Sequence, residues 1–388
     1  MTTDTAYADH IGLPEDRSAD AGRPGRELTG PSAQAQAREE ILRFRSRRPW
    51  RAIGATAVES VLYAGCAVAV VLAPAAVKPF VSIGLALVAG RMFVIAHDAC
   101  HGSLFSSRLA NRIVGRALFL TSYTPYSLWD LGHNRIHHAF TNLKGRDYVW
   151  APMSRSDYRH APAWRQRLER LYRNPVGHGL YYFLEIYWKR LLFPSRRYVP
   201  EPRPAYRWDS VAVTLFALAQ VGALAVAARL TGQSAVVLIA AGVVAPFGLF
   251  NLLMGSAIFL HHTHPLVTWF DDVHEWSAAE PQLRGSVHVV FPLGLGALLH
   301  NIMDHTAHHI DPLIPLFHVP DAQRAIERHF EAPIFGTPIL KPKVQTWTLK
   351  FFLDAVRTCK LYDYDAHRWL DFDGRTTSQV PQVRSIRW

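Results

Sequence analysis

Four long apolar runs divide the chain into membrane-like and polar parts. The runs 58–77 and 80–96 are separated only by the dipeptide Lys-Pro, and the runs 211–230 and 235–260 only by the polar stretch TGQS. A membrane-spanning helix needs about 20 mostly apolar residues. Because the runs come as two close pairs, they predict four transmembrane helices in two hairpins rather than buried core helices of a soluble protein. We therefore expect an all-α integral membrane protein.

The remaining segments suggest how the chain is organised around these spans. Residues 1–45 are polar and rich in Gly, Pro and Arg, which is typical of a disordered tail. A membrane domain is expected over 46–345 and a C-terminal cytosolic extension over 346–388. The stretches 113–129 and 178–194 mix aromatic residues with isolated charges. Two interpretations stay open for them, helices lying in the membrane interface or ordinary core helices of a cytosolic cap.

The charge distribution predicts the orientation. The chain carries a net charge of +11, and residues 97–209 hold 18 Lys and Arg, whereas the two hairpin turns hold only Lys78. Lys and Arg are enriched in cytoplasmic loops of membrane proteins. Both termini and the middle segment should therefore face the cytosol, with the spans in the cytoplasmic membrane. The positive charge is then explained by topology, which makes nucleic acid a poor candidate partner.

Histidines gather in three short motifs. They stand in HDACH, HNRIHH and HTAHH, at spacings that place side chains on one face of a helix. The eight residues are His97, His101, His133, His137, His138, His305, His308 and His309. The charge rule places all three motifs on the cytosolic side, so together they predict a metal site. A ninth ligand is expected from HHTHP, where His262 and His264 are both candidates; His262 is more securely helical because His264 precedes a proline.

The ligand type narrows the metal chemistry. Imidazole suits Zn, Cu, Fe and Ni, and eight or nine ligands exceed what one ion accepts. Two ions with open positions for oxygen fit this count, whereas a structural zinc site would be four-coordinate and usually include sulfur. The three cysteines lack CxxC spacing, so neither a disulfide framework nor a thiolate site is expected.

Several polar residues near the histidines are candidates to accept the outer N–H of a ligand imidazole. They are Asp98, Asn134, Asp147, Asn301 and Asp304, each of which could instead be a helix cap or a solvated polar residue. Four further histidines near the motifs are taken as structural: His274, His288, His300 and His318. Arg91 stands inside the second apolar run, where it must either reach the interface or meet an acidic partner.

The three histidine motifs together with two membrane hairpins resemble the membrane fatty acid desaturase superfamily. FLHHTHP, and HNIMDHTAHHIDPLIP running into VPDAQRAIE, are most similar to acyl-lipid Δ12 and ω3 desaturases. The resemblance covers about residues 50–340. Many relatives have HxxHH as the second motif, and this chain has one residue more. The resemblance implies two non-haem iron ions bound by the histidines, O2 as co-substrate, and an acyl lipid that receives a cis double bond.

The same resemblance implies an external electron donor, a ferredoxin or a cytochrome b5-like carrier, because no HPGG, Cys-rich or GxGxxG motif is present. Related di-iron hydroxylases, acetylenases and carotenoid hydroxylases or ketolases share such histidine motifs and remain the alternative. A non-enzymatic metal-handling membrane protein is the second class of function. It would place charged ligands inside the membrane, whereas these histidines gather at its edge.

Overall fold

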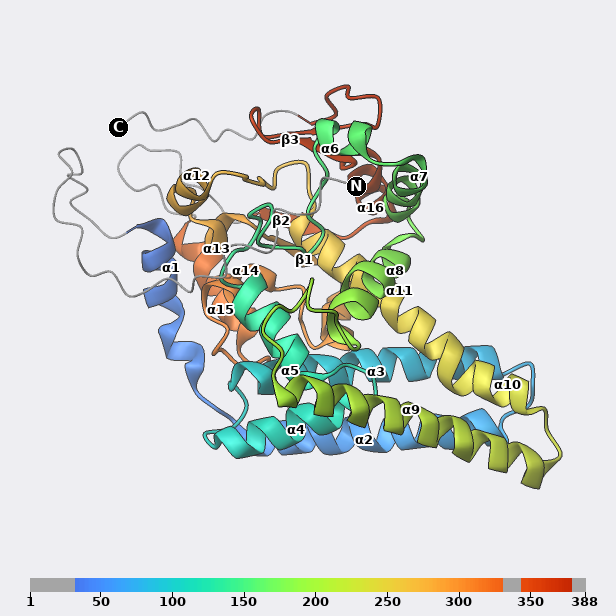
Figure 1. The fold of residues 1–388 in the computed structure, drawn as a ribbon. Helices are drawn as coiled ribbons and strands as arrows, with labels where there is room; N and C mark the ends of the chain where they lie inside the picture. The colour runs from blue at the N-terminus through green and yellow to red at the C-terminus, as the bar shows by residue number, and fades with distance from the viewer. Residues whose placement is uncertain (1–31, 331–342, 379–388) are drawn as a thin grey trace.

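The computed structural model describes residues 32–330 and 343–378, and it is mostly helical (Figure 1). Four helices are long and apolar enough to cross a membrane, as the apolar runs predicted. They are α2 (Pro49–Leu72), α3 (Lys78–His101), α9 (Pro204–Thr231) and a continuous helix Ala235–His262 made of α10 (Ala235–Ile239), η5 (Ala240–Val244) and α11 (Ala245–His262).

The four long helices differ in how much of their surface the protein covers. Helix α2 contacts α3, α9 contacts α10, and α11 crosses α3. The most apolar windows of α2 and α9 are only 11% buried, against 56% for α3 and 28% for the helix Ala235–His262. The second helix of each pair is therefore the inner one, and both inner helices end in a histidine.

The other elements gather around the ends of the long helices that lie away from their connecting turns (Figure 1). The helical ones are α1 (Ala33–Ile41), η2 (Leu42–Arg45), α4 (Arg108–Leu120), α5 (Tyr126–Trp129), η3 (Asp130–His137), α6 (Arg155–His160), α7 (Ala163–Tyr172), α8 (His178–Tyr181), η4 (Tyr182–Leu191), α12 (Val273–Ala278), α13 (Pro281–Arg284), η6 (Pro292–Leu299), α14 (His305–Ile310), α15 (Val319–His329) and α16 (Leu349–Thr358). We call this part of the molecule the cap.

Two small sheets correct the all-α expectation. Strand β1 (Val287–Val290) pairs in parallel with β2 (Lys343–Thr346), and β3 (Leu361–Asp363) pairs antiparallel with β4 (Arg368–Leu370). Strands of three or four residues are too short to leave a readable alternation of apolar and polar positions. The first sheet is nevertheless important, because β1 leads the chain from α13 towards the third histidine motif.

The expected N-terminal tail is wrong for residues 33–45, which form α1 and η2. The Ser32 side chain caps α1 by accepting a hydrogen bond from the Ala35 N–H at 3.2 Å. Ala37 and Ile41 are fully buried in a cluster with residues of α14 and α15. In the sequence, α1 is hard to distinguish from a polar tail, because Ile41 is its only large apolar residue. Residues 1–31 lie outside the described part of the chain.

Arg91 has the acidic partner that an intramembrane arginine needs. Its guanidinium lies 2.6 Å from the Glu59 carboxylate on the neighbouring helix α2, and the Glu59 side chain is buried. The pair joins two helices in their apolar sections, so Arg91 does not need to extend to the membrane interface.

The two aromatic stretches left open by the sequence each bury one face. Helix α4 packs against α3, and α8 with η4 packs against α11. Both also expose apolar residues, since Ile113 and Trp188 are each 59% exposed. Such surfaces suit either interpretation, interface helices or cap helices.

A glycine allows α8 to approach α11 closely. A Cβ added at Gly255 would lie 2.1 Å from the His178 carbonyl oxygen. The Gly255 carbonyl also accepts a hydrogen bond from the Trp150 indole N–H at 3.0 Å. Gly255 therefore fixes the place where α8 of the cap crosses α11.

Candidate metal centre

The three histidine motifs come together in the structure and divide into two groups. Within each group, one ligand atom per residue lies within 4.8 Å of all the others. The first group is His97, His101, His133 and His308; the second group is His137, His262, His305 and His309. Helix α3 supplies two members of the first group and α11 supplies one of the second, while η3 and α14 contribute to both.

The second motif is a π-helix, which explains its additional residue. The His138 N–H donates to the His133 carbonyl, five residues back, at 3.0 Å. This hydrogen bond brings His133 and His138 onto one face, with their Nε2 atoms 3.2 Å apart, and it turns His137 towards the second group. π-Helical turns are rare and are often found at functional sites. The additional residue therefore distributes one motif between two groups.

The imidazoles point their Nε2 atoms into each group. In the first group the Nε2 atoms of His97 and His133 are 2.8 Å apart. In the second group His305 Nε2 lies 3.1 Å from His262 Nε2 and 3.0 Å from His309 Nε2. Of two facing nitrogens at most one can carry a proton, so hydrogen bonding alone cannot satisfy such a cluster.

The outer nitrogens of several imidazoles fix where the proton sits. His137 Nδ1 lies 3.0 and 3.1 Å from the two carboxylate oxygens of Asp147, and His262 Nδ1 lies 3.0 Å from the Gly285 carbonyl oxygen. These oxygens only accept, so Nδ1 must donate and Nε2 keeps its lone pair. Lone pairs converging in a buried space repel one another unless a cation lies between them, so the donor set fits metal ions.

Burial also keeps the imidazoles neutral, which is the form that binds metals. Burial, and then the charge of neighbouring imidazoles, lowers the pKa of five cluster histidines that lie outside the four long helices: His133, His138, His305, His308 and His309. Five imidazoles therefore remain available as ligands at pH values where exposed histidines are protonated.

Three histidines of the motifs fall outside the two groups of four. His138 lies between them, with its Nε2 3.0 Å from His308 Nε2 and its ring 4.5 Å from that of His309. His264 is turned away from both groups, and its Nε2 lies 3.4 Å from the Gln345 amide oxygen. His261 was not anticipated; its ring stacks on His305 at 3.6 Å.

Of the five polar residues expected around the histidines, some contact a cluster imidazole and the others have different surroundings. Asp98 and Asp147 contact cluster imidazoles, the first at 3.2 Å from His97 Nδ1. Asn134 instead donates to Asp130 and to the Cys100 carbonyl. Asp304 lies 2.8 Å from His288 Nε2, and Asn301 adopts a left-handed backbone conformation after η6. The structure thus brings only the two aspartates, among the five candidates, to the histidine groups.

Two polar partners were missed by sequence reasoning. The Gln282 amide oxygen lies 3.1 Å from His309 Nδ1, and the Thr141 hydroxyl lies 3.3 Å from the same atom. Thr141 follows the second motif by one helical turn and could have been considered. Gln282 stands in α13, far from any motif, so no local signal identifies it.

Of the four histidines taken as structural, two contact acidic residues of other elements. His288 lies between Asp304 and Glu327, and His300 Nε2 is 3.3 Å from Glu59. His274 is exposed on α12, and His318 lies beside Ser46. None of the four belongs to either histidine group.

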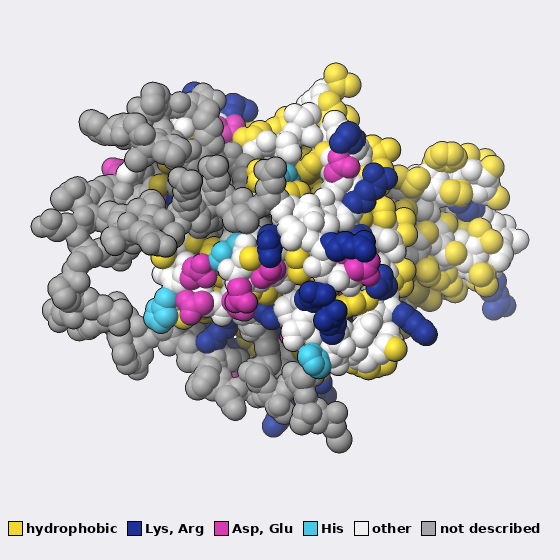
Figure 2. Space-filling model, turned by 90° about the horizontal axis from the view of Figure 1, so that it is seen from above, with side chains coloured by type: hydrophobic (Ala, Val, Ile, Leu, Met, Phe, Trp, Pro, Cys, Tyr) yellow, Lys and Arg dark blue, Asp and Glu magenta, His cyan; other side chains and the backbone are white. Residues whose placement is uncertain are grey.

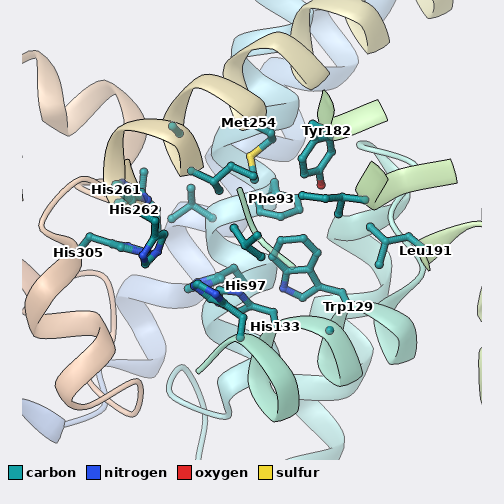
Figure 3. A pocket seen from close by; sticks show the side chains of 18 of the residues that line it. Phe93, His97, Trp129, His133, Tyr182, Leu191, Met254, His261, His262 and His305 are labelled. Atoms are coloured by element: carbon teal, nitrogen blue, oxygen red, sulfur yellow. The ribbon is translucent and has the colours of Figure 1, made fainter. Parts of the chain in front are cut away.

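An apolar cavity opens beside both groups (Figure 3). Phe93, Trp129, Tyr182 and Met254 form part of its wall, and His97, His133, His262 and His305 form the wall nearest the ligand atoms. The Trp129 ring stacks on His133 at 5.0 Å. A long apolar chain entering this cavity would be brought directly to the imidazoles.

Comparison with known proteins places this centre in a family. The family model "Fatty acid desaturase" matches residues 72–336. The chain is 27% identical over 290 residues to the omega-6 fatty acid desaturase, chloroplastic, of Brassica napus, covering 72% of this chain and 59% of that protein. It is 28% identical over 271 residues to the sn-1 oleoyl-lipid 12-desaturase of Synechocystis, covering 70% of this chain and 72% of that protein.

The chain spans somewhat over half the length of the chloroplast relatives, with 57% of the Spinacia oleracea omega-6 desaturase covered at 28% identity. The match of the family model nevertheless includes every histidine of both groups. It also includes all of α3, α9 and the helix Ala235–His262, but only the last residue of α2. The resemblance found in the histidine motifs is therefore confirmed, and this chain belongs to the fatty acid desaturase family.

Proposed function

We propose that this protein is a membrane acyl-lipid desaturase that introduces a cis double bond into an acyl chain at a non-haem di-iron centre. One observation carries the proposal: two four-histidine groups face one apolar cavity. The names of the relatives, omega-6 fatty acid desaturase and sn-1 oleoyl-lipid 12-desaturase, support an acyl-lipid substrate.

Each iron is assigned to one histidine group, with His138 lying between the two as a ninth ligand and His262 preferred over His264. Two iron ions held there would supply, with O2, an oxidant strong enough to remove hydrogen from an unactivated methylene, which no amino-acid side chain can do. One turnover removes two hydrogen atoms from neighbouring carbons. It takes two electrons from the donor and two protons from solvent, and reduces one O2 to two waters.

The protein's own residues contribute position and exclusion of water. The cavity walls, among them Phe93 and Met254, hold the acyl chain in an apolar space. Asp147 and the Gly285 carbonyl orient His137 and His262 through their outer nitrogens. Such outer partners fix the tautomer and the direction of a metal-binding imidazole.

For the topology we propose two hairpins, α2 with α3 and α9 with α10–α11, and a cap on the cytosolic side of the cytoplasmic membrane. The 18 Lys and Arg of residues 97–209 support this orientation for the cap and both termini. We keep 46–345 as the membrane domain and 346–388 as its C-terminal extension.

The electron donor is proposed to be a soluble carrier, a ferredoxin or a cytochrome b5-like protein. Lys and Arg side chains are spread over the face seen in Figure 2, although a group of Asp and Glu lies among them. Charge complementarity of this kind speeds the encounter with an acidic donor.

The test is expression in a host with a simple fatty-acid profile and a competent electron donor, followed by analysis of the lipids. A new cis-unsaturated acyl chain is expected, together with iron in the purified protein at two ions per chain, one for each histidine group. The His137→Ala variant, expressed to the same level, is the control and should yield no product. An alcohol, a ketone or a triple bond in place of the alkene would identify one of the related di-iron activities instead.

A further inference from the structure

Segment η6 (Pro292–Leu299), with the sequence PLGLGALL, exposes three leucine side chains. Leu293 is 96% exposed, Leu298 58% and Leu295 44%. Its backbone is irregular, since Leu293 and Gly294 have φ values of 56° and 70°. Contiguous apolar surface of this kind marks an interaction site on a soluble protein, and here its position identifies the partner.

The end of η6 lies beside the apolar section of α3. Arg91 Nη1 donates to the Leu298 carbonyl at 2.8 Å and to the Ala297 carbonyl at 3.4 Å. Arg91 stands six residues before His97, which is about 9 Å along the helix towards the hairpin turn. The segment therefore turns back from the histidine level along the side of the span.

The position of Arg91 can also be estimated along α2, through its partner Glu59, and the two estimates agree. The same guanidinium donates to Glu59 at 2.6 and 2.9 Å. Trp50, 82% exposed at the start of α2, is the type of residue that marks the membrane interface. Glu59 stands nine residues further on, about 13 Å along the helix. Because the hydrocarbon core is about 30 Å thick, Arg91, Glu59 and the end of η6 lie within one leaflet.

The contacts of Arg91 provide hydrogen-bond donors for backbone carbonyls at the end of η6. Non-helical backbone at membrane depth is tolerated only where it is buried against protein or lines a water-filled cavity, because lipid offers no hydrogen-bond partners. The guanidinium supplies donors to the last carbonyls of η6, and Glu59 balances its charge. This accounts for an arginine in an otherwise apolar run, and for a buried acid on the helix opposite.

We propose that η6 is inserted in the cytosolic leaflet beside α2 and α3, with the lipid hydrocarbon as the partner of the Leu293, Leu295 and Leu298 side chains and with its irregular backbone kept at the level of the headgroups and against the protein. Its anchor is the Arg91–Glu59 pair. The proposal rests on the topology given under the proposed function, in which α2 and α3 span the membrane. The apolar residues exposed on α2 and the exposed leucines of η6 then both face the lipid.

The insertion has a consequence for the metal centre. Beyond η6 the chain passes Ile302, which lines the cavity, and reaches His305 at the start of α14. Phe291, just before η6, stacks on Trp347 at 5.5 Å. The lipid contact therefore positions the segment that closes one side of the cavity and delivers the third histidine motif.

Spin labelling in liposomes tests the depth directly. In the full chain with Cys66, Cys100 and Cys359 replaced by alanine, a label on Leu293→Cys is compared with labels on Leu62→Cys in α2 and Val273→Cys in α12. Collisions with O2, which partitions into hydrocarbon, and with a water-soluble nickel chelate are measured for each. The Leu293 label should match the Leu62 label, with high O2 and low nickel accessibility. A Leu293 label as open to nickel as the Val273 label overturns the proposal.

The Leu62 label separates failure of this inference from failure of the topology, because an aqueous signal there would mean that α2 does not span. The anchor is tested with Arg91→Met, which keeps an apolar stem and removes the donors. Nickel accessibility at position 293 should rise in this variant and stay unchanged in the matched control Arg229→Met, near the other hairpin turn. If Arg91→Met does not fold, Glu59→Gln weakens the same anchor, and an unchanged signal in the folded variant contradicts the anchor's role.

Discussion

The two histidine groups use the same residue type but differ in their surroundings. All four members of the second group are buried, whereas two members of the first group, His101 and His133, are only partly buried. Three members of the second group have an oxygen atom beside their outer nitrogen, from Asp147, Gly285 and Gln282. In the first group only His97 has such a contact among the described residues, with Asp98 at 3.2 Å.

For the proposed di-iron centre, this difference predicts that the second metal position is held more firmly than the first. Outer partners orient an imidazole, fix its tautomer and raise its basicity as a ligand. Partial burial leaves the first position more accessible to water and small molecules.

The largest effect is expected from removing a ligand of the second group. His262→Ala should abolish product formation and lower the iron content, because its Nε2 is one of four atoms that converge on the second position. His264→Ala is the matched control two residues away, and it should retain iron and activity because His264 faces Gln345. Iron analysis and lipid analysis of both variants show which of the two histidines is the ligand. Loss of iron in His264→Ala with retention in His262→Ala would reverse the assignment.

The next effect concerns the outer carboxylates. Asp147→Asn should reduce metal affinity or activity by about 10- to 100-fold, the usual cost of losing such a partner. Asp147 contacts His137 through both carboxylate oxygens, while Asp98 contacts His97 through one. Asp98→Asn should therefore have the smaller effect. Iron titration of the two metal-free variants measures the difference, and equal losses would remove the distinction between the groups.

The histidine motifs and apolar runs gave most of this centre because their signals are local. Spacing within HDACH, HNRIHH and HTAHH predicted that the histidines of each motif share a helix face. The structure gathers all eight, but it divides the second and third motifs between the two groups. The contact of Asp147 with His137 joins residues only ten positions apart. The choice between His262 and His264 could also be argued from the following proline.

The features that could not be predicted from the sequence depend on contacts between distant segments. Gln282 reaches His309 from α13, and Glu59 reaches Arg91 across 32 residues. The π-helix of the second motif was equally hidden, because an α-helix and a π-helix are compatible with the same pattern of histidines. The folded residues 33–45 were missed because their burial is provided by α14 and α15, late in the chain.

A chelator should release the two irons at different rates. The partly buried first group should lose its iron in a fast phase and the second group in a slow phase, each of about half the total. The release of iron from purified protein into a coloured ferrous chelate measures both phases. Asp147→Asn should accelerate the slow phase and Asp98→Asn the fast one. A single phase in the unaltered protein would show that the two positions are held equally.

The smallest effect concerns support of the second group from outside its direct contacts. His288 lies 2.8 Å from Asp304, the residue before His305, and 2.6 Å from Glu327 in α15. Burial alone would lower its pKa, but the hydrogen bonds to Asp304 and Glu327 outweigh burial and raise the pKa of His288 to about 9. A raised pKa means that the protonated form stabilises the fold fully below the ordinary histidine pKa, near 6.5, and that this stabilisation is lost as the pH rises through about 9.

Thermal unfolding in detergent between pH 7 and pH 10 measures this contribution. The midpoint of the unaltered protein should fall over this range, and His288→Gln should have a lower midpoint at pH 7 but a weaker dependence on pH. The two curves should approach each other above pH 9, where the unaltered protein also lacks the charge. Parallel curves would mean that His288 contributes no titrating ion pair. The support of α14 would then come from packing alone, and the second group would owe its firmness only to the direct partners of its imidazoles.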